Sequence, residues 1–177
     1  MKKKYFLVFA LSGVLLAGTA VWAAPFGGPE DVKYSQALWK ALVKAKLAGS
    51  DSIKGTPYTG QHPHGAILDT VDSTIKVKGT TGAVIVKRNY GGPGVSKQAV
   101  ADNPDKFLKA VTVMFKRAGY DPEDKDWFWA KFKPDGSLDK NPAGMELAGM
   151  VAKGKPKGCI ACHKAAPGGD FVFNYNR

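Results

Sequence analysis

Residues 66–90 read AILDTVDSTIKVKGTTGAVIVKRNY, and this stretch decides the fold class. β-Branched residues are abundant in residues 66–77 and again in residues 82–90, and a Gly-Gly-Pro-Gly turn follows at residues 91–94. Such runs, bounded by turn residues, are typical of β-strands. We therefore predict two strands in this stretch.

A second pair of strand-like runs follows, at residues 107–117 and 127–133. The turn-rich sequence GYDPED at residues 119–124 lies between them. Turn residues between two apolar runs predict a hairpin or a meander of neighbouring strands. The four runs together favour a mainly β domain over a helical bundle.

The run WFWAKFK at residues 127–133 places aromatic side chains on both faces of its strand. Because side chains alternate along a strand, Trp127 and Trp129 share one face, whereas Phe128, Ala130 and Phe132 share the other. Both faces therefore have apolar surface to bury. We expect one face to pack on a core and the other on a bound group or a partner subunit.

Residues 31–47 have the pattern of an amphipathic helix. Leu38 and Leu42 belong to an apolar stripe with a spacing of three to four residues, Pro29 stands at the start, and Gly49 is the expected end. The stripe should face the core. The following residues 49–65 are rich in Gly, Ser, Pro and Thr, which predicts a loop.

The N-terminal 23 residues have the features of a signal peptide. Three lysines at residues 2–4 precede an apolar run over residues 5–16, and Val21-Trp22-Ala23 supplies small residues for cleavage after Ala23. The apolar run is short for a bilayer span, which argues against an uncleaved anchor. We therefore expect residues 24–177 to form one exported domain, periplasmic or otherwise outside the cytoplasm and free of the membrane after cleavage.

The chain is basic, with 26 Lys and Arg against 15 Asp and Glu and a formal net charge of +11. Without the three lysines of residues 2–4 the formal charge is +8, and it is spread along the chain. This balance favours acidic partners or surfaces, such as an acidic redox protein, and its simplest interpretation is a solvated basic surface. The aromatic and basic pattern of a nucleic-acid binder is absent from the sequence, so we expect no nucleic-acid partner.

The motif with the clearest chemistry is Cys159-Ile160-Ala161-Cys162-His163. C-x-x-C-H is the attachment signature of haem c, in which two thiols bind one porphyrin and the adjacent imidazole is the proximal iron ligand. A disulfide, a thioredoxin-like pair and half of a zinc site are the alternatives. However, these are the only cysteines, and no βαβ pattern surrounds them. We therefore predict one covalent haem c, with His163 on the iron.

Several further segments resemble the cytochrome P-460 family, which also contains the β-sheet cytochromes c′ (cytochrome c′-beta). They are PHGA (63–66), GAVIVK (82–87), VMFKR (113–117), GYDP (119–122), WFWAK (127–131), GCIACH (158–163) and DFVF (170–173). The resemblance covers most of residues 24–177. It implies an α+β fold, predominantly an antiparallel sheet with flanking helices and a C-terminal haem segment. It also implies a homodimer, because members of the family are usually dimeric. It also implies an open distal haem site that meets small nitrogen species.

In catalytic members of this family a lysine is bonded to the haem rim, and the haem oxidises hydroxylamine. By its place in the GAVIVK strand, Lys87 matches that lysine, although other members keep a plain haem and bind nitric oxide or related gases. Read without the resemblance, Lys87 is an ordinary solvated strand residue. The resemblance therefore implies a hydroxylamine-oxidising enzyme, and the alternative from the same family is a gas-binding protein.

A third function, electron transfer, would follow if a protein side chain closed the sixth iron position. His62 and His64 are the only other histidines, and one of them could ligate the iron. His64 could instead form a hydrogen bond on the distal side, or face solvent as most loop histidines do. Three methionines are further candidate ligands, and Glu146 is a candidate distal acid. The three methionines are Met114, Met145 and Met150.

Overall fold

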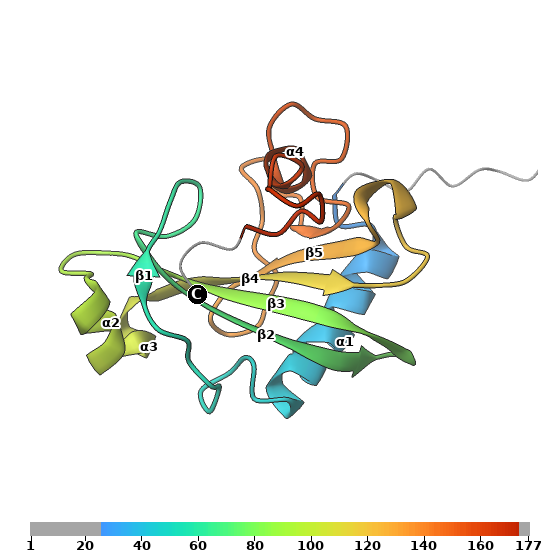
Figure 1. Cartoon of the computed structure of the whole chain (residues 1–177). Helices are drawn as coiled ribbons and strands as arrows, with labels where there is room; N and C mark the ends of the chain where they lie inside the picture. The colour runs from blue at the N-terminus through green and yellow to red at the C-terminus, as the bar shows by residue number, and fades with distance from the viewer. Residues whose placement is uncertain (1–25, 174–177) are drawn as a thin grey trace, which may run out of the picture.

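The computed structural model describes residues 26–173, and the predicted signal peptide at residues 1–23 lies outside them. Six antiparallel strands form one sheet in the order β1-β2-β3-β4-β5-β6, so each strand pairs with the next along the chain (Figure 1). Their bounds are β1 Tyr58–Thr59, β2 Ile67–Val77, β3 Thr80–Tyr90, β4 Leu108–Lys116, β5 Trp127–Phe132 and β6 Ala148–Gly149. The predicted strands and the α+β class are confirmed. Among the described residues, no helix is long and apolar enough to cross a membrane.

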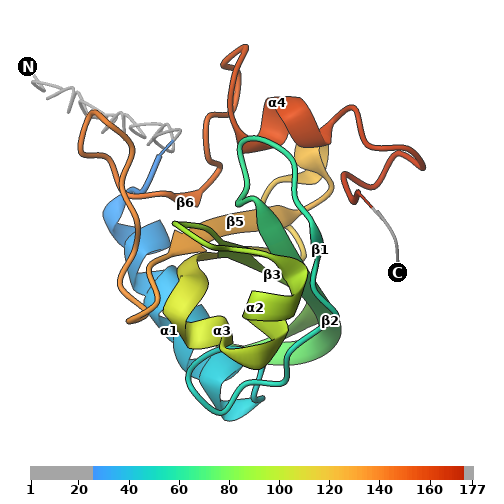
Figure 2. The same ribbon diagram turned by 90° about the vertical axis from the view of Figure 1, so that its left-hand side faces the viewer.

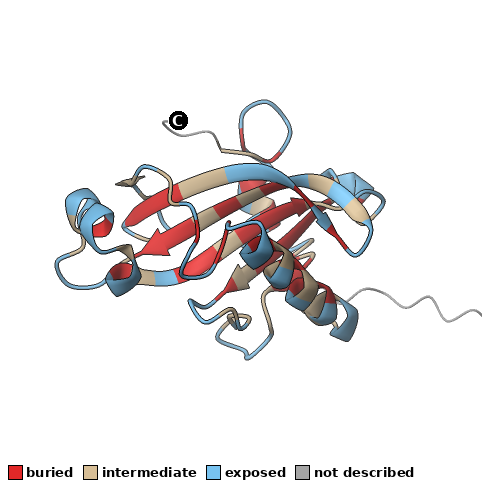
Figure 3. Ribbon diagram, turned by 90° about the horizontal axis from the view of Figure 1, so that it is seen from below, coloured by how far each residue is buried: buried red, intermediate tan, exposed pale blue. Residues whose placement is uncertain are grey.

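One face of the sheet packs on helix α1, Pro29–Lys44, which crosses it as Figure 3 shows. Leu38 and Leu42 of α1 are fully buried against alternate residues of the central strands, among them Val84, Val113 and Phe128. Burial of each such side chain contributes about 1.5–3 kcal/mol. Phe128, Ala130 and Phe132 all belong to this core, as their alternation predicts.

Helix α1 ends three residues earlier than the sequence pattern predicts. The backbone N–H of Lys46 donates to the carbonyl of Val43, and that of Leu47 donates to the carbonyl of Leu42. This is a Schellman motif, with Lys46 in the left-handed conformation (φ 55°) that glycine usually occupies. The helix therefore ends at Lys44 and not at the predicted residue 47, because Lys46 and not Gly49 reverses the chain.

The opposite face of the sheet is covered by the C-terminal segment, which contains the short helix α4, Cys159–His163. Trp127 and Trp129 point to this side and form a second apolar cluster with Ile160 and Phe171. Figure 1 shows α4 and α1 on opposite sides of the sheet. The two predicted faces of β5 thus have different partners.

Two short helices that the sequence pattern did not predict lie between β3 and β4 in the chain. They are α2 (Lys97–Asp102) and α3 (Pro104–Phe107). Each begins at a side-chain cap, since Ser96 accepts from the N–H of Ala99 and Asn103 accepts from that of Lys106. They lie beside the end of β3, as Figure 2 shows. Val100 and Phe107 pack there against Tyr90.

Candidate functional site

Helix α4 presents both cysteine thiols on one side of a single turn. Cys159 and Cys162 are three residues apart, exposed and not joined in a disulfide. Ile160 lies between them and is buried in the second apolar cluster, so it holds the turn on the sheet while the thiols stay accessible. Residues three apart on a helix are neighbours. The two sulfurs can therefore reach the same bound group.

His163 completes this turn with its imidazole buried. Its Nδ1 lies 2.6 Å from the carbonyl oxygen of Phe171, so Nδ1 carries the hydrogen and donates it. Burial lowers the pKa of His163, as does nearby Lys87, while the bond to Phe171 raises it. A neutral imidazole with Nδ1–H donated to a carbonyl leaves Nε2 as the free ligand atom. This is the arrangement of a metal-binding histidine.

A second imidazole, that of His64, lies beside His163 with the ring centroids 6.3 Å apart and nearly perpendicular. Its Nδ1 is 3.0 Å from Oδ1 of Asn89 on β3. Burial, followed by the positive charge of Lys87, lowers the pKa of His64 to about 4, and the bond to Asn89 opposes this. His64 is therefore neutral at physiological pH.

The loop that carries His64 is packed closely on the end of β3. A Cβ added at Gly65 would lie 2.7 Å from the backbone nitrogen of Tyr90, so only glycine allows this approach. Figures 1 and 2 both show the loop after β1 rising on the same side of the sheet as α4. The fold thus brings residues 64 and 163 together across a long sequence distance.

Lys87 was also singled out from the sequence, and the structure places it on the same face of the sheet. It is partly buried on β3, opposite Thr70 of β2 and Thr112 of β4. Its positive charge lies near enough to lower the pKa of both His64 and His163. Lys131 of β5 also lowers the pKa of His64, so the arrangement combines two lysines with two neutral imidazoles.

The residues present fit a haem c. Two accessible thiols and a neutral imidazole with a free Nε2 are the donors that such a group requires. The indole N–H of Trp129 is an independent observation, because it is buried without an acceptor among the described residues. The ring of Trp129 lies 4.8 Å from that of His163. A bound group with acceptor oxygens, such as haem propionates, would satisfy this donor.

Ion pairs hold the C-terminal segment on the sheet. Lys153 contacts Asp121 and is 2.9 Å from Glu123, and Lys164 is 2.8 Å from the fully buried Asp124. The indole N–H of Trp127 donates to the carbonyl of Asp170 at 2.9 Å. These contacts fix the chain on either side of α4, so the cysteines and His163 have a defined position.

The remaining candidates from the sequence lie elsewhere or pack in the core. His62 and Met145 are exposed. Met114 is buried in the second apolar cluster, with Met150 packed against it. Glu146 forms a β-bridge with Lys140. Sequence reasoning did not single out Asn89, although its spacing of two residues from Lys87 on a strand would have placed it on the same face.

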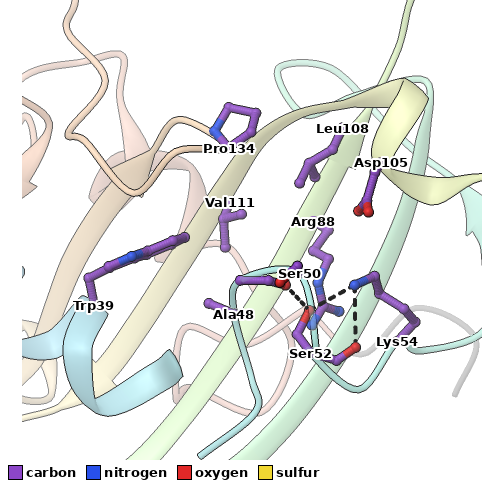
Figure 4. Close-up of a pocket in the computed structure, with 11 residues that line it drawn as sticks. Trp39, Ala48, Ser50, Ser52, Lys54, Arg88, Asp105, Leu108, Val111 and Pro134 are labelled. Carbon is purple, nitrogen blue, oxygen red and sulfur yellow. Dashed lines mark hydrogen bonds between the residues drawn. The ribbon is translucent and has the colours of Figure 1, made fainter. Parts of the chain in front are cut away.

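The cavity in Figure 4, about 190 Å³, is not part of this arrangement. Trp39 of α1, Val111 and Arg88 line it, so it opens on the α1 side of the sheet. Arg88 is already bonded to Asp69 and to the carbonyls of residues 47 and 53. The chemistry of the thiols and imidazoles therefore belongs to the opposite face.

The family model described as Cytochrome P460 matches residues 46–174 of the chain. No curated protein and no solved structure matches the chain. The matched range begins after α1 and includes every strand, His64, Lys87, Asn89 and the whole of α4.

Proposed function

The chain belongs to the cytochrome P460 family and is a c-type haem protein, and from this premise we propose that it is an exported, single-haem enzyme that oxidises hydroxylamine or a related small nitrogen compound. The observation that carries the proposal is the gathering of Lys87, His64 and His163 on one face of the sheet. Lys87 corresponds to the lysine that catalytic members bond to the haem rim. Its position beside the iron ligand is what such a bond requires.

The residues of α4 would hold the haem. Cys159 and Cys162 would each add an S–H across a vinyl group, and Nε2 of His163 would bind the iron. When bound, the haem would supply a redox-active iron that can bind a small ligand. The Phe171 carbonyl keeps the hydrogen of His163 on Nδ1, and this orients the ring and makes Nε2 a stronger donor. Trp129 packs edge-on against the same ring.

Lys87 would be joined to the haem rim through Nζ. The new N–C bond replaces one N–H and one C–H, so its formation releases two protons and two electrons to an oxidant such as a peroxide. Electrons from the nitrogen substrate would then pass to an acidic acceptor protein, which the formal charge of +8 without the three lysines of residues 2–4 favours. Two chains would associate as a homodimer, as the family resemblance implies, and export would follow from residues 1–23.

We expect Lys87→Arg to abolish the cross-link completely, because a guanidinium stays protonated and is a poor nucleophile. Peptide mapping of the purified holoprotein should find the haem peptide joined to the Lys87 peptide in the wild type and not in the variant. The reduced Soret band of the wild type should be strongly red-shifted and should return to an ordinary c-type position in the variant.

Lys76→Arg is the matched control, because Lys76 is an exposed lysine of β2. It should leave both the linkage and the spectrum unchanged. An ordinary five-coordinate spectrum in the wild type, with no linked peptide, would refute the cross-link and support a protein that binds nitric oxide without turnover.

Electron transfer is the second candidate, and the position of His64 favours it. Imidazole nitrogens bind metals at about 2 Å, so a single iron could bridge two rings whose centroids are 6.3 Å apart. His64 would then be the sixth ligand. A six-coordinate, low-spin ferric spectrum that becomes five-coordinate in His64→Leu would establish this function in place of the enzymatic one.

A further inference from the structure

The carbonyl group that accepts the hydrogen of His163 belongs to a residue with an unusual backbone conformation. Phe171 has a φ of 64°, in the left-handed region that a bulky side chain rarely adopts. Such a conformation costs free energy and persists only where the surrounding contacts enforce it. The ring of Phe171 is buried in the second apolar cluster, with Trp127 and Ile160 among its members. The strain therefore lies at the residue that contacts the predicted iron ligand.

The preceding residue, Asp170, is attached to the sheet by its backbone and by its side chain. The indole N–H of Trp127 donates to the Asp170 carbonyl at 2.9 Å, and Nζ of Lys116 lies 2.6 Å from the Asp170 carboxylate. Trp127 is 2% exposed, whereas the side chains of Lys116 and Asp170 are 34% and 57% exposed. An exposed ion pair contributes little, because water screens it. The bond from the buried indole is therefore the stronger attachment.

These contacts connect β5 to His163 through one peptide plane and one residue. The Asp170 carbonyl and the backbone nitrogen of Phe171 belong to the same planar unit, so the bond from Trp127 fixes that plane. The backbone angles of Phe171 then determine the direction of its own carbonyl, and its buried ring restricts them. That carbonyl oxygen lies 2.6 Å from Nδ1 of His163. A strand of the sheet thus orients the acceptor of the imidazole hydrogen.

We propose that Trp127 and Phe171 are positioning residues for the proximal histidine, and that they set the reduction potential of the haem by holding the Phe171 carbonyl on Nδ1 of His163. A hydrogen bond from Nδ1–H makes Nε2 a stronger donor to the iron. Stronger donation favours the ferric over the ferrous state and so lowers the potential. The inference goes beyond the proposed function, because it requires only a haem c with His163 on the iron.

The test is a spectroelectrochemical titration of the full-length holoprotein and of its variant Trp127→Phe. Phenylalanine keeps an aromatic ring in the apolar cluster but has no N–H to donate. At the midpoint potential of the wild type, the ferrous-to-ferric ratio should be about tenfold higher in the variant, which is about the effect of one hydrogen bond. For a one-electron couple this ratio corresponds to a rise in the midpoint of about 59 mV.

Proton NMR of the reduced carbon monoxide complex separates this mechanism from a general loosening of the haem environment. The complex is diamagnetic, so the Nδ1 proton of His163 can be observed directly. In Trp127→Phe this proton should move upfield and exchange faster with solvent, because its bond to the Phe171 carbonyl is weaker. A merely structural role for Trp127 would leave the resonance of this proton in place.

Two further variants are controls. Trp39→Phe makes the same change on the α1 side of the sheet, where Trp39 packs on Phe132, and it should change neither measurement. Lys116→Gln removes the exposed ion pair and one positive charge but keeps the indole bond. Loss of a positive charge near the haem favours the ferric state, so the ferrous-to-ferric ratio should fall, by less than about twofold.

Phe171→Gly keeps the test decisive if Trp127→Phe does not fold. Glycine adopts the left-handed conformation readily but lacks the buried ring, so the midpoint should rise in this variant too. Three results would overturn the inference: unchanged midpoints in both variants, a raised midpoint with the Nδ1 proton of His163 unmoved, or an equal rise in Trp39→Phe. A wild type that does not oxidise hydroxylamine would refute the proposed function alone, since neither measurement depends on turnover.

Discussion

Replacing Cys159 and Cys162 together with serine is expected to abolish covalent haem attachment. The two thiols are exposed, unpaired and three residues apart on one turn, whereas a serine hydroxyl does not form the thioether bond. Intact-mass measurement should show the mature wild type heavier than its polypeptide by one haem and the double variant at the mass of the polypeptide alone. A haem-stained denaturing gel should show a band for the wild type only.

Ala161→Ser is the matched control for this experiment. It places a serine on the same turn, between the two cysteines, without removing a thiol. We expect it to retain the full mass of one haem. Covalent haem in the double variant would mean that other residues attach it, and a mass of two haems in the wild type would contradict a single site.

A large loss of stability is expected when Asp69 is replaced, because its carboxylate is buried in an ion pair with Arg88. Its side chain and that of Arg88 are 1% and 2% exposed, and Oδ1 lies 2.6 Å from the guanidinium. Tyr90 donates to Oδ2 at 2.6 Å, and burial, together with this bond, raises the pKa of Tyr90. Asp69→Asn would leave Arg88 buried and unpaired. We expect it to lower the free energy of unfolding by about 3–5 kcal/mol.

Urea denaturation followed by far-ultraviolet circular dichroism would measure this loss. The control is Asp51→Asn, at an exposed aspartate whose Oδ1 accepts a 3.4 Å hydrogen bond from the hydroxyl of Ser50, and it should change the free energy of unfolding by less than about 0.5 kcal/mol. A loss of under about 1 kcal/mol for Asp69→Asn would mean that Arg88 is compensated by the carbonyls of Leu47 and Ile53.

The long strands could be predicted because successive side chains point to opposite faces of the sheet, and each face packs on a different part of the protein. Phe128 and Trp129 are neighbours in sequence, yet one packs under α1 and the other beside His163. The short helices α2 and α3 could not be predicted in the same way, because four to six residues are too few for a clear apolar period. The end of α1 was misplaced because its reversal uses a lysine.

The site was predictable only where the chemistry is local in sequence. Cys159, Cys162 and His163 form one motif, whereas Lys87 was found through the family resemblance. The spacing of Asn89 from Lys87 indicates its face of the strand but not its contact with His64, which depends on the loop before β2 and on the pairing of β3 with β4. Such contacts between distant segments appear only once the register of the sheet is known.

The division of the sheet into two faces also bears on the order in which the protein is assembled. Within residues 26–173, the core under α1 contains no residue beyond 148, although it joins the helix to all four long strands. The part of the molecule built around this core can therefore become compact while the residues after 148 are still unfolded. A haem-attaching enzyme would then meet two accessible thiols on a scaffold that already has its shape.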